Sequence, residues 1–258
     1  MWPTGRVGYV DDDALLALCH QVADVVPPAL EAVKDLTAAG ERPGQYALDL
    51  AADRVVLEVL DVPGMGVLSE ESGLHRPDSP FIAVVDPVDG STNASRGVPW
   101  YATSVCVVDK DGPRASVVAN LATGVRYHAV RGGGAWRGTT RIEPSACTEM
   151  RRAIVALSGY PGHHLGWAQF RAFGAAALEL CAVAEGMIDV FSVGGRAHLA
   201  PWDYLGAMLL CTEAGATVAD LEDRELVTTE FAARRAIAAT ATPALMVELR
   251  RSAPLGNK

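Results

Sequence analysis

The chain has 258 residues, half of them hydrophobic, and a formal net charge of −9. This length suffices for one large domain or two small ones, with room for a sizeable core. The acidic balance argues against a nucleic-acid-binding surface, because a phosphate backbone attracts faces rich in lysine and arginine.

Neither a secretory leader nor a membrane span is expected. The first residues lack a basic region followed by an apolar core, and no apolar run reaches the 18 or so residues of a membrane helix. The 5 cysteines are scattered without C-x-x-C spacing, which fits reduced thiols better than a disulfide framework. We therefore expect a soluble, cytoplasmic protein.

The N-terminal part of the chain has helical patterns. Three aspartates at 11–13 are suited to start a helix whose apolar residues recur at helical spacing. Pro27 and Pro28 are predicted to end it, since proline lacks the N–H that a helix interior needs, and a second helix is predicted over 28–39. A third helix is predicted over 48–60 from its apolar stripe.

Strand patterns dominate the middle of the chain, and helices and strands alternate after it. We predict strands over 81–85, 101–108, 115–120, 125–130 and 152–158, the second and third joined by a hairpin turn. The later helices are predicted over 173–185, 202–214 and 243–251, with strands over 187–193, 217–219 and 236–239. Such mixed patterns favour helices packed on sheets.

One short segment combines several groups that can bind a phosphate ester. The apolar strand 81–85 leads into Asp86 and Asp89, and a turn through Gly90 and Ser91 follows. Mg²⁺ binds proteins through one or two carboxylates together with substrate phosphate oxygens. Backbone N–H groups at a helix start favour an anion. The alternative is an Asp-Pro turn followed by a helix cap.

Matching elements occur elsewhere in the chain. A Glu-Glu pair at Glu70 precedes the Asp-Pro-Val-Asp-Gly-Ser run, and Trp-Asp at Asp203 is followed by Glu-Ala-Gly at Glu213. In this order and at these separations, the elements resemble those of the inositol monophosphatase family, the lithium-sensitive Mg²⁺-dependent sugar-phosphate phosphatases. The resemblance extends over about 48–239.

The resemblance implies an α+β fold. It would be a layered α-β-α-β-α sandwich with a large, mostly antiparallel sheet and a smaller mixed sheet. We expect one domain over 1–258, in which 1–145 form the N-terminal helices and the large sheet, and 146–258 form a C-terminal α/β half.

The resemblance also implies a metal site of two or three Mg²⁺ ions. Its first ion would be held by Glu70, Asp86 and the carbonyl of Val88, the second by Asp86, Asp89 and Asp203, and a weaker third again by Glu70. Four converging carboxylates would repel one another strongly without cations. The alternatives are a solvated loop acid for Glu70 and an ordinary acid at a helix start for Asp203.

The catalytic residues implied by the resemblance are Asp53, Glu70 and Ser91. Ser91 stands where the family usually has threonine, and its hydroxyl, paired with Asp53, would orient and deprotonate the attacking water. Serine keeps the donor and acceptor but lacks the stiffening methyl group. A helix cap for Ser91 and an exposed helical acid for Asp53 remain the alternatives.

Substrate contacts are implied for a larger set: Asp89, Gly90, Ser91, Thr92, Gly174, Ala175, Arg196 and Asp203. Ala175 lacks the hydroxyl that the family usually has there, and Arg196 stands where inositol-specific members carry glutamate. A cation there would favour a second negative group or another polyol geometry, unless it is a surface arginine. We expect His163, His164 and His198 to be loop residues rather than ligands, and Trp100 and Trp202 to be packing residues.

These features predict a Mg²⁺-dependent phosphomonoesterase for a small polyol or sugar phosphate, with inositol 1-phosphate as the first candidate. A histidinol-phosphate phosphatase, or another small-metabolite phosphatase, is the alternative, since enzymes with elements like 97–103 catalyse that step. A non-catalytic regulatory or binding member is the alternative of another class, because some relatives associate with the transcription machinery. The expected partners are a small phosphorylated metabolite and a second copy of the chain, with neither nucleic acid nor membrane.

Overall fold

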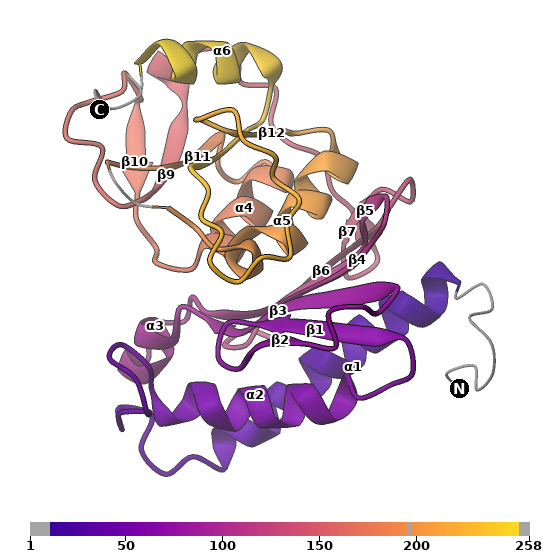
Figure 1. Ribbon diagram of the computed structural model, residues 1–258. Helices are drawn as coiled ribbons and strands as arrows, with labels where there is room; N and C mark the ends of the chain where they lie inside the picture. Colours follow the sequence, from indigo (N-terminus) through magenta and orange to yellow (C-terminus); the bar gives the residue numbers. More distant parts are fainter. Residues whose placement is uncertain (1–10, 196–197, 253–258) are drawn as a thin grey trace.

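In the part of the chain that the structure describes, two β-sheets and six α-helices form five layers (Figure 1). The computed structural model describes residues 11–195 and 198–252. Its helices are α1 Asp12–Glu31, α2 Ala47–Val59, α3 Ser91–Arg96, α4 Ala176–Ala184, α5 Pro201–Ala214 and α6 Pro243–Ser252, with a 3₁₀ turn at Met150–Arg152. No described helix is both long and apolar enough to cross a membrane.

The large sheet has eight strands in the order β2-β1-β3-β4-β5-β6-β7-β8. Of its described strand pairs, β1 and β3 are parallel and the others are antiparallel. Its strands are β1 Met65–Ser69, β2 Gly73–His75, β3 Phe81–Asp89, β4 Ala102–Asp109, β5 Gly112–Asn120, β6 Arg126–Val130, β7 Ala135–Arg137 and β8 Thr140–Arg141. The expectation of a large, mostly antiparallel sheet is confirmed.

The small sheet has five strands in the order β10-β9-β11-β13-β12. The pairs β10/β9 and β9/β11 are parallel, and β11/β13 and β13/β12 are antiparallel, so this sheet is mixed as expected. Its strands are β9 Ile154–Ser158, β10 Gln169–Arg171, β11 Val190–Val193, β12 Thr217–Asp220 and β13 Ile237–Thr240.

The two faces of the large sheet are covered by different helices. On β3, Ala83 and Val85 pack with α1 and α2, whereas Ile82 and Val84 belong to the core shared with α4 and α5. This division follows from the alternation of side chains along a strand. Figure 1 shows α4 and α5 between the two sheets, and α6 on the outer side of the small sheet. The predicted layer order is therefore confirmed.

The predicted break at Pro27 and Pro28 is wrong. Helix α1 continues through both prolines and ends at Glu31, and residues 32–39 are not helical. Each proline removes one N–H donor, but the helical pattern continues past them, since the N–H of Ala32 donates to the carbonyl of Pro28 at 3.2 Å. The predicted helix over 28–39 fails because the carboxylate of Asp35 accepts hydrogen bonds from the backbone N–H and hydroxyl of Thr37, which fixes a local turn.

The strand that carries the two aspartates is longer than predicted. β3 does not end at Val85 but continues to Asp89, with a shift in its pairing with β4 between Asp86 and Asp89. In a regular strand, two side chains three residues apart, such as those of Asp86 and Asp89, would point to opposite faces of the sheet. The shift makes it possible for both carboxylates to face the same region, as bulges commonly do near active sites.

Candidate active site

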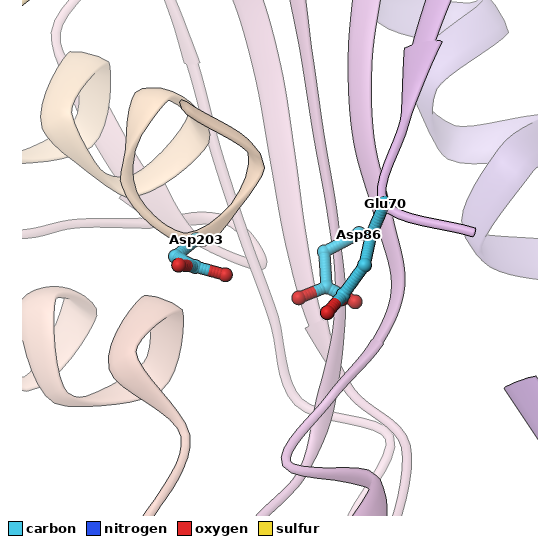
Figure 2. Close-up of side chains that lie close together, drawn as sticks. All are labelled: Glu70, Asp86 and Asp203. Carbon is cyan, nitrogen blue, oxygen red and sulfur yellow. The ribbon is translucent and has the colours of Figure 1, made fainter. Parts of the chain in front are cut away.

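Three carboxylates from separate elements converge between the large sheet and α5. One oxygen of each of Glu70, Asp86 and Asp203 lies within 4.8 Å of the others. Figure 2 shows the three carboxylate groups turned toward one another. Glu70 directly follows β1, whose parallel pairing with β3 pairs Ser69 with Val85 and so brings Glu70 beside Asp86. Asp203 lies in the first turn of α5, where its carboxylate accepts a 2.7 Å hydrogen bond from the backbone N–H of Ala200.

Asp89 adds a fourth carboxylate next to this group. It is buried, and its Oδ2 accepts a 2.7 Å hydrogen bond from the backbone N–H of Ala177 at the start of α4. Asp86 is held from its own strand, since its Oδ1 accepts a 3.0 Å hydrogen bond from the N–H of Val88. The bulge on β3 therefore presents one aspartate to Glu70 and the other to α4.

The electrostatics of the cluster disfavour four bare negative charges. Burial, with the charge of Asp203 next in importance, raises the pKa of Glu70 to about 8. Burial also raises the pKa of Asp203 to about 6, against the opposing effects of the Ala200 N–H and Arg234. The pKa values of Asp86 and Asp89 lie well above the usual range for the same reasons, burial first and neighbouring carboxylates second.

The donor set fits a hard divalent cation. All the converging side chains offer carboxylate oxygens, which Mg²⁺ prefers. Among the described ion pairs, none joins a lysine or arginine to Glu70, Asp86 or Asp89. Buried charges are normally paired or bound to metal. The arrangement therefore suits metal binding better than it suits a metal-free fold.

Ser91 lies beside Asp49, and the expected pairing with Asp53 is wrong. Burial raises the pKa of Asp49 to about 7, and the nearby side chain of Ser91 opposes this rise. Asp53 instead accepts a 2.5 Å hydrogen bond from the hydroxyl of Ser69. Positions 49 and 53 share one helix face but differ by about 6 Å along the axis, so they meet different neighbours.

Asp49 is thus a site residue that the sequence analysis missed. It lies in the first turn of α2, where its Oδ2 accepts a 2.8 Å hydrogen bond from the backbone N–H of Tyr46. A signal was available, because an acid at this position of a helix caps the first turn and is thereby fixed in orientation. The family resemblance was instead carried over to Asp53, the acid one turn later on the same face.

The turn at Gly90 forms a tight junction between the two halves of the chain. Its φ is +85°, and a Cβ at this residue would lie 3.0 Å from both the carbonyl oxygen of Gly174 and the Cβ of Ala175. The Asn93 side chain fixes the same junction by donating to the carbonyls of Trp100 (2.8 Å) and Phe173 (2.6 Å). Glycine alone fits such an approach without strain.

The predicted substrate residues around this junction differ in accessibility. Ser91 and Thr92 begin α3, whose first N–H groups lack helical partners. Ala175 is only 1% exposed, so it offers a substrate almost no surface. Gly174 packs against Asn93 with a φ of +84°. Arg196 lies outside the described residues.

A pocket of about 330 Å³ joins these groups to two loops. Its lining is Arg42, Pro43, Gly44, Gln45, Asp49, Glu70, Glu71, Ser91, Trp202, Phe231 and Arg234. The sequence analysis singled out Glu70, Ser91 and Trp202 from this set. The residues from the loops before α2 and before β13 carried no motif, and only the folded chain brings them together.

The histidines and tryptophans that the sequence analysis discussed have partners within the protein. His163 hydrogen-bonds the carbonyl of Ser252 at 2.9 Å, and Nδ1 of His164 accepts from the N–H of Gly166 at 2.9 Å. His198 pairs with Glu222 at 3.0 Å. Trp202 is 4% exposed, and Trp100 stacks on Phe173 with ring centroids 4.7 Å apart, so both are packing residues.

Residues 18–254 match the model of the inositol monophosphatase family. The chain belongs to this family. The fructose-1,6-bisphosphatase/inositol-1-monophosphatase of Archaeoglobus fulgidus is 32% identical over 232 residues, covering 86% of this chain and 90% of that protein. The Nus factor SuhB of Escherichia coli is 32% identical over 192 residues, covering 67% of this chain and 70% of that protein.

Solved structures share the architecture. The extragenic suppressor protein suhB of Bartonella henselae superposes with a TM-score of 0.80 at 27% identity, covering 95% of this chain and all of that one. The inositol monophosphatase–fructose 1,6-bisphosphatase MJ0109 gene product has a TM-score of 0.77 at 21% identity, which shows the fold alone. The chain is therefore a member of a family of phosphatases, some of whose relatives are named as Nus factors.

Proposed function

We propose that this protein is a Mg²⁺-dependent phosphomonoesterase that hydrolyses a small polyol or sugar phosphate. The observation that carries the proposal is the convergence of Glu70, Asp86 and Asp203 within 4.8 Å, where no ion pair among the described residues joins any of the three to a lysine or arginine. Family membership supports phosphatase chemistry at this position.

Two or three Mg²⁺ ions would be held by the carboxylates of Glu70, Asp86, Asp89 and Asp203 and by the carbonyl of Val88. When bound, Mg²⁺ supplies positive charge to the phosphoryl oxygens and the leaving alkoxide and acidifies a water molecule. The chain supplies the geometry: Asp86, Asp89 and Asp203 each accept a hydrogen bond from a backbone N–H, and Glu70 directly follows β1, which pairs with β3.

Ser91 and Asp49 would handle the proton of the attacking water. The Ser91 hydroxyl accepts a proton from the water while it donates its own to Asp49, so no covalent enzyme intermediate is needed. With a pKa of about 7, set mainly by burial, Asp49 suits a general base near neutral pH. Asp53, in contrast, would support the site through Ser69, the residue next to Glu70.

The start of α3 would orient the phosphate. N–H groups of Ser91 and Thr92 have no helical acceptor and are suited to donate to phosphoryl oxygens. The close junction between Gly90 and Gly174 would hold these donors in place. Hydrolysis by in-line displacement needs mainly such positioning and charge neutralisation.

The test is phosphate release from a panel of phosphomonoesters, with Mg²⁺ and with EDTA. The panel includes inositol 1-phosphate, histidinol phosphate, fructose 1,6-bisphosphate and several nucleotides. We expect at least one ester to be hydrolysed only in the presence of Mg²⁺. Absence of Mg²⁺-dependent hydrolysis across the panel, with metal binding shown by calorimetry, would favour a non-catalytic role instead.

That non-catalytic role is the second candidate, because relatives about 32% identical are named Nus factor SuhB. The complete set of acids argues for catalysis. A protein retained only for binding would have no need to keep four carboxylates at a mutual electrostatic cost.

A further inference from the structure

The pocket extends beyond the groups that would bind the phosphate. Past Glu70 and Ser91, its walls come from the loop before α2 and from the loop before β13. Phe231 of the second loop is 40% exposed and stacks against Trp202 with ring centroids 5.1 Å apart. This outer part therefore offers an aromatic surface where the alcohol portion of a substrate would lie.

Two arginines line this outer part, and one of them is already neutralised. The Nη2 of Arg42 donates to the Glu71 carboxylate at 2.6 Å, and Glu71 also accepts from Gln45. The charge of Arg42 is therefore already paired within the pocket wall.

Arg234 has different surroundings. Its Nη1 donates to the carbonyls of Phe231 (3.0 Å) and Ala233 (2.7 Å), and its guanidinium lies 5.3 Å from the centre of the Trp202 ring. No ion pair joins it to a carboxylate among the described residues, and none of its described hydrogen bonds uses Nε or Nη2. These donors are available to a ligand in the pocket.

The guanidinium is also fixed in place. Two backbone carbonyls bind its Nη1, and the Trp202 ring packs against the guanidinium plane. Little conformational freedom is therefore lost when Nε and Nη2 bind a ligand. Its nearness to Asp203, whose pKa it lowers, places it next to the cluster of acids. Once those acids are neutralised by metal, Arg234 is left with no carboxylate partner of its own.

We propose that Arg234 binds a second anionic group of the substrate, either a carboxylate or a second phosphate, while the carbon skeleton lies against Phe231. This proposal rests on the proposed phosphatase function and narrows its substrate class. It predicts that the monophosphate of an uncharged polyol, such as inositol 1-phosphate, is a poor substrate, since it has no second anionic group to pair with the guanidinium.

The experiment uses two matched pairs of esters at low ionic strength and saturating Mg²⁺. Glycerol 3-phosphate and 3-phosphoglycerate differ by a hydroxymethyl group against a carboxylate. Fructose 1-phosphate and fructose 1,6-bisphosphate differ by a hydroxyl against a phosphate. For at least one pair we expect kcat/KM to be about ten- to a hundredfold higher for the ester that carries a second anionic group. A charge-assisted hydrogen bond provides a difference of this size. The pair that shows the preference indicates whether Arg234 binds a carboxylate or a second phosphate.

Variants assign the preference to this residue. Arg234→Gln should abolish the preference, because it should lower kcat/KM for the ester with the second anion much more than for the ester without it, and Arg234→Lys should retain part of the preference. Arg251→Gln is the matched control: it removes the same charge from an exposed position on α6 and should keep the preference.

Three results would overturn the proposal. The wild type could show no preference in either pair, the preference could survive Arg234→Gln, or Arg234→Gln could reduce both members of a pair equally. The last result would show that Arg234 binds the transferred phosphate or supports Trp202. In each of these cases hydrolysis itself still stands, whereas absence of Mg²⁺-dependent turnover of these four esters and of the whole panel would refute the proposed function as well.

Discussion

The hydroxyl of Ser91 lies beside the carboxylate of Asp49, while Asp53, one turn further along α2, accepts a hydrogen bond from Ser69. Two acids on one helix face therefore have separate tasks. Asp49 reaches the start of α3, where an attacking water would lie. Asp53 reaches the end of β1 and supports the segment that carries Glu70.

Substitution of the two acids should separate these tasks. Asp49→Asn should lower kcat by about a hundredfold or more, the contribution of a positioned general base. Asp53→Asn should retain kcat within several-fold, because an amide oxygen can still accept the Ser69 hydrogen bond. Steady-state phosphate release measures both, and the reverse order of effects would restore Asp53 as the base.

Ser91 should tolerate threonine but not alanine. Ser91→Thr keeps the hydroxyl that lies beside Asp49, so kcat should stay within a few-fold of the wild type. Ser91→Ala removes the only group of this side chain that can relay a proton, and kcat should fall by about a hundredfold. Equal activity of the serine and alanine enzymes would exclude the relay.

Gly90→Ala should destabilise the fold much more than Gly97→Ala. Both glycines have a positive φ, +85° and +71°, so each substitution should cost about 1–2 kcal/mol of backbone strain. At Gly90 the new Cβ would also meet Gly174 and Ala175 at 3.0 Å, whereas at Gly97 it meets nothing within 4 Å. Overpacking adds about 1–3 kcal/mol. Urea unfolding of the two variants measures the difference, and equal losses would contradict the tight junction.

The stability of the metal-free protein should fall as pH rises. Burial raises the pKa of Glu70 to about 8, of Asp203 to about 6 and of Asp49 to about 7, above the roughly 4 of these groups in an unfolded chain. The folded state then binds more protons than the unfolded one. Its advantage is complete below pH 4 and is lost as pH rises through these values.

Bound Mg²⁺ should reverse this loss, because it favours the charged carboxylates. Thermal unfolding in EDTA and in Mg²⁺ at pH 5, 6.5 and 8 is the measurement. The stabilisation by Mg²⁺ should grow with pH and reach about 5 °C or more at pH 8, equivalent to roughly 2 kcal/mol for a chain of this size. A constant melting temperature in EDTA, or no effect of Mg²⁺ at pH 8, would contradict the metal site.

Sequence patterns predicted those parts of the site that are local. The aspartates at 86 and 89 and the glycine at 90 lie in one run, and Asp203 lies at the start of an apolar helix that ends at Gly215, as α5 does. Such signals depend on neighbours within a few residues. The layer order was predicted in another way, from the family resemblance, and is confirmed by the two sheets.

The remaining parts depend on contacts between distant segments. Arg42 and Arg234 line one pocket although nearly the whole fold separates them in the chain. The short strands β2, β8 and β10 have too few residues to show a period, and exist because a neighbouring strand pairs with them. On α2 both Asp49 and Asp53 are buried together with Leu48, Ala52 and Val56, so the apolar stripe could not show which acid meets Ser91.

The central claim is that metal held by the carboxylate cluster performs the hydrolysis. The most direct measurement compares wild type and Asp86→Asn for phosphate release from the best ester of the panel, with Mg²⁺ and with EDTA. Asp86 is buried among the other acids, so its loss should lower Mg²⁺-dependent kcat/KM by more than about a hundredfold, since even partners of metal ligands are worth ten- to a hundredfold. The protein in EDTA should be equally inactive. Activity of Asp86→Asn near the wild-type level, with its fold intact, would contradict the account.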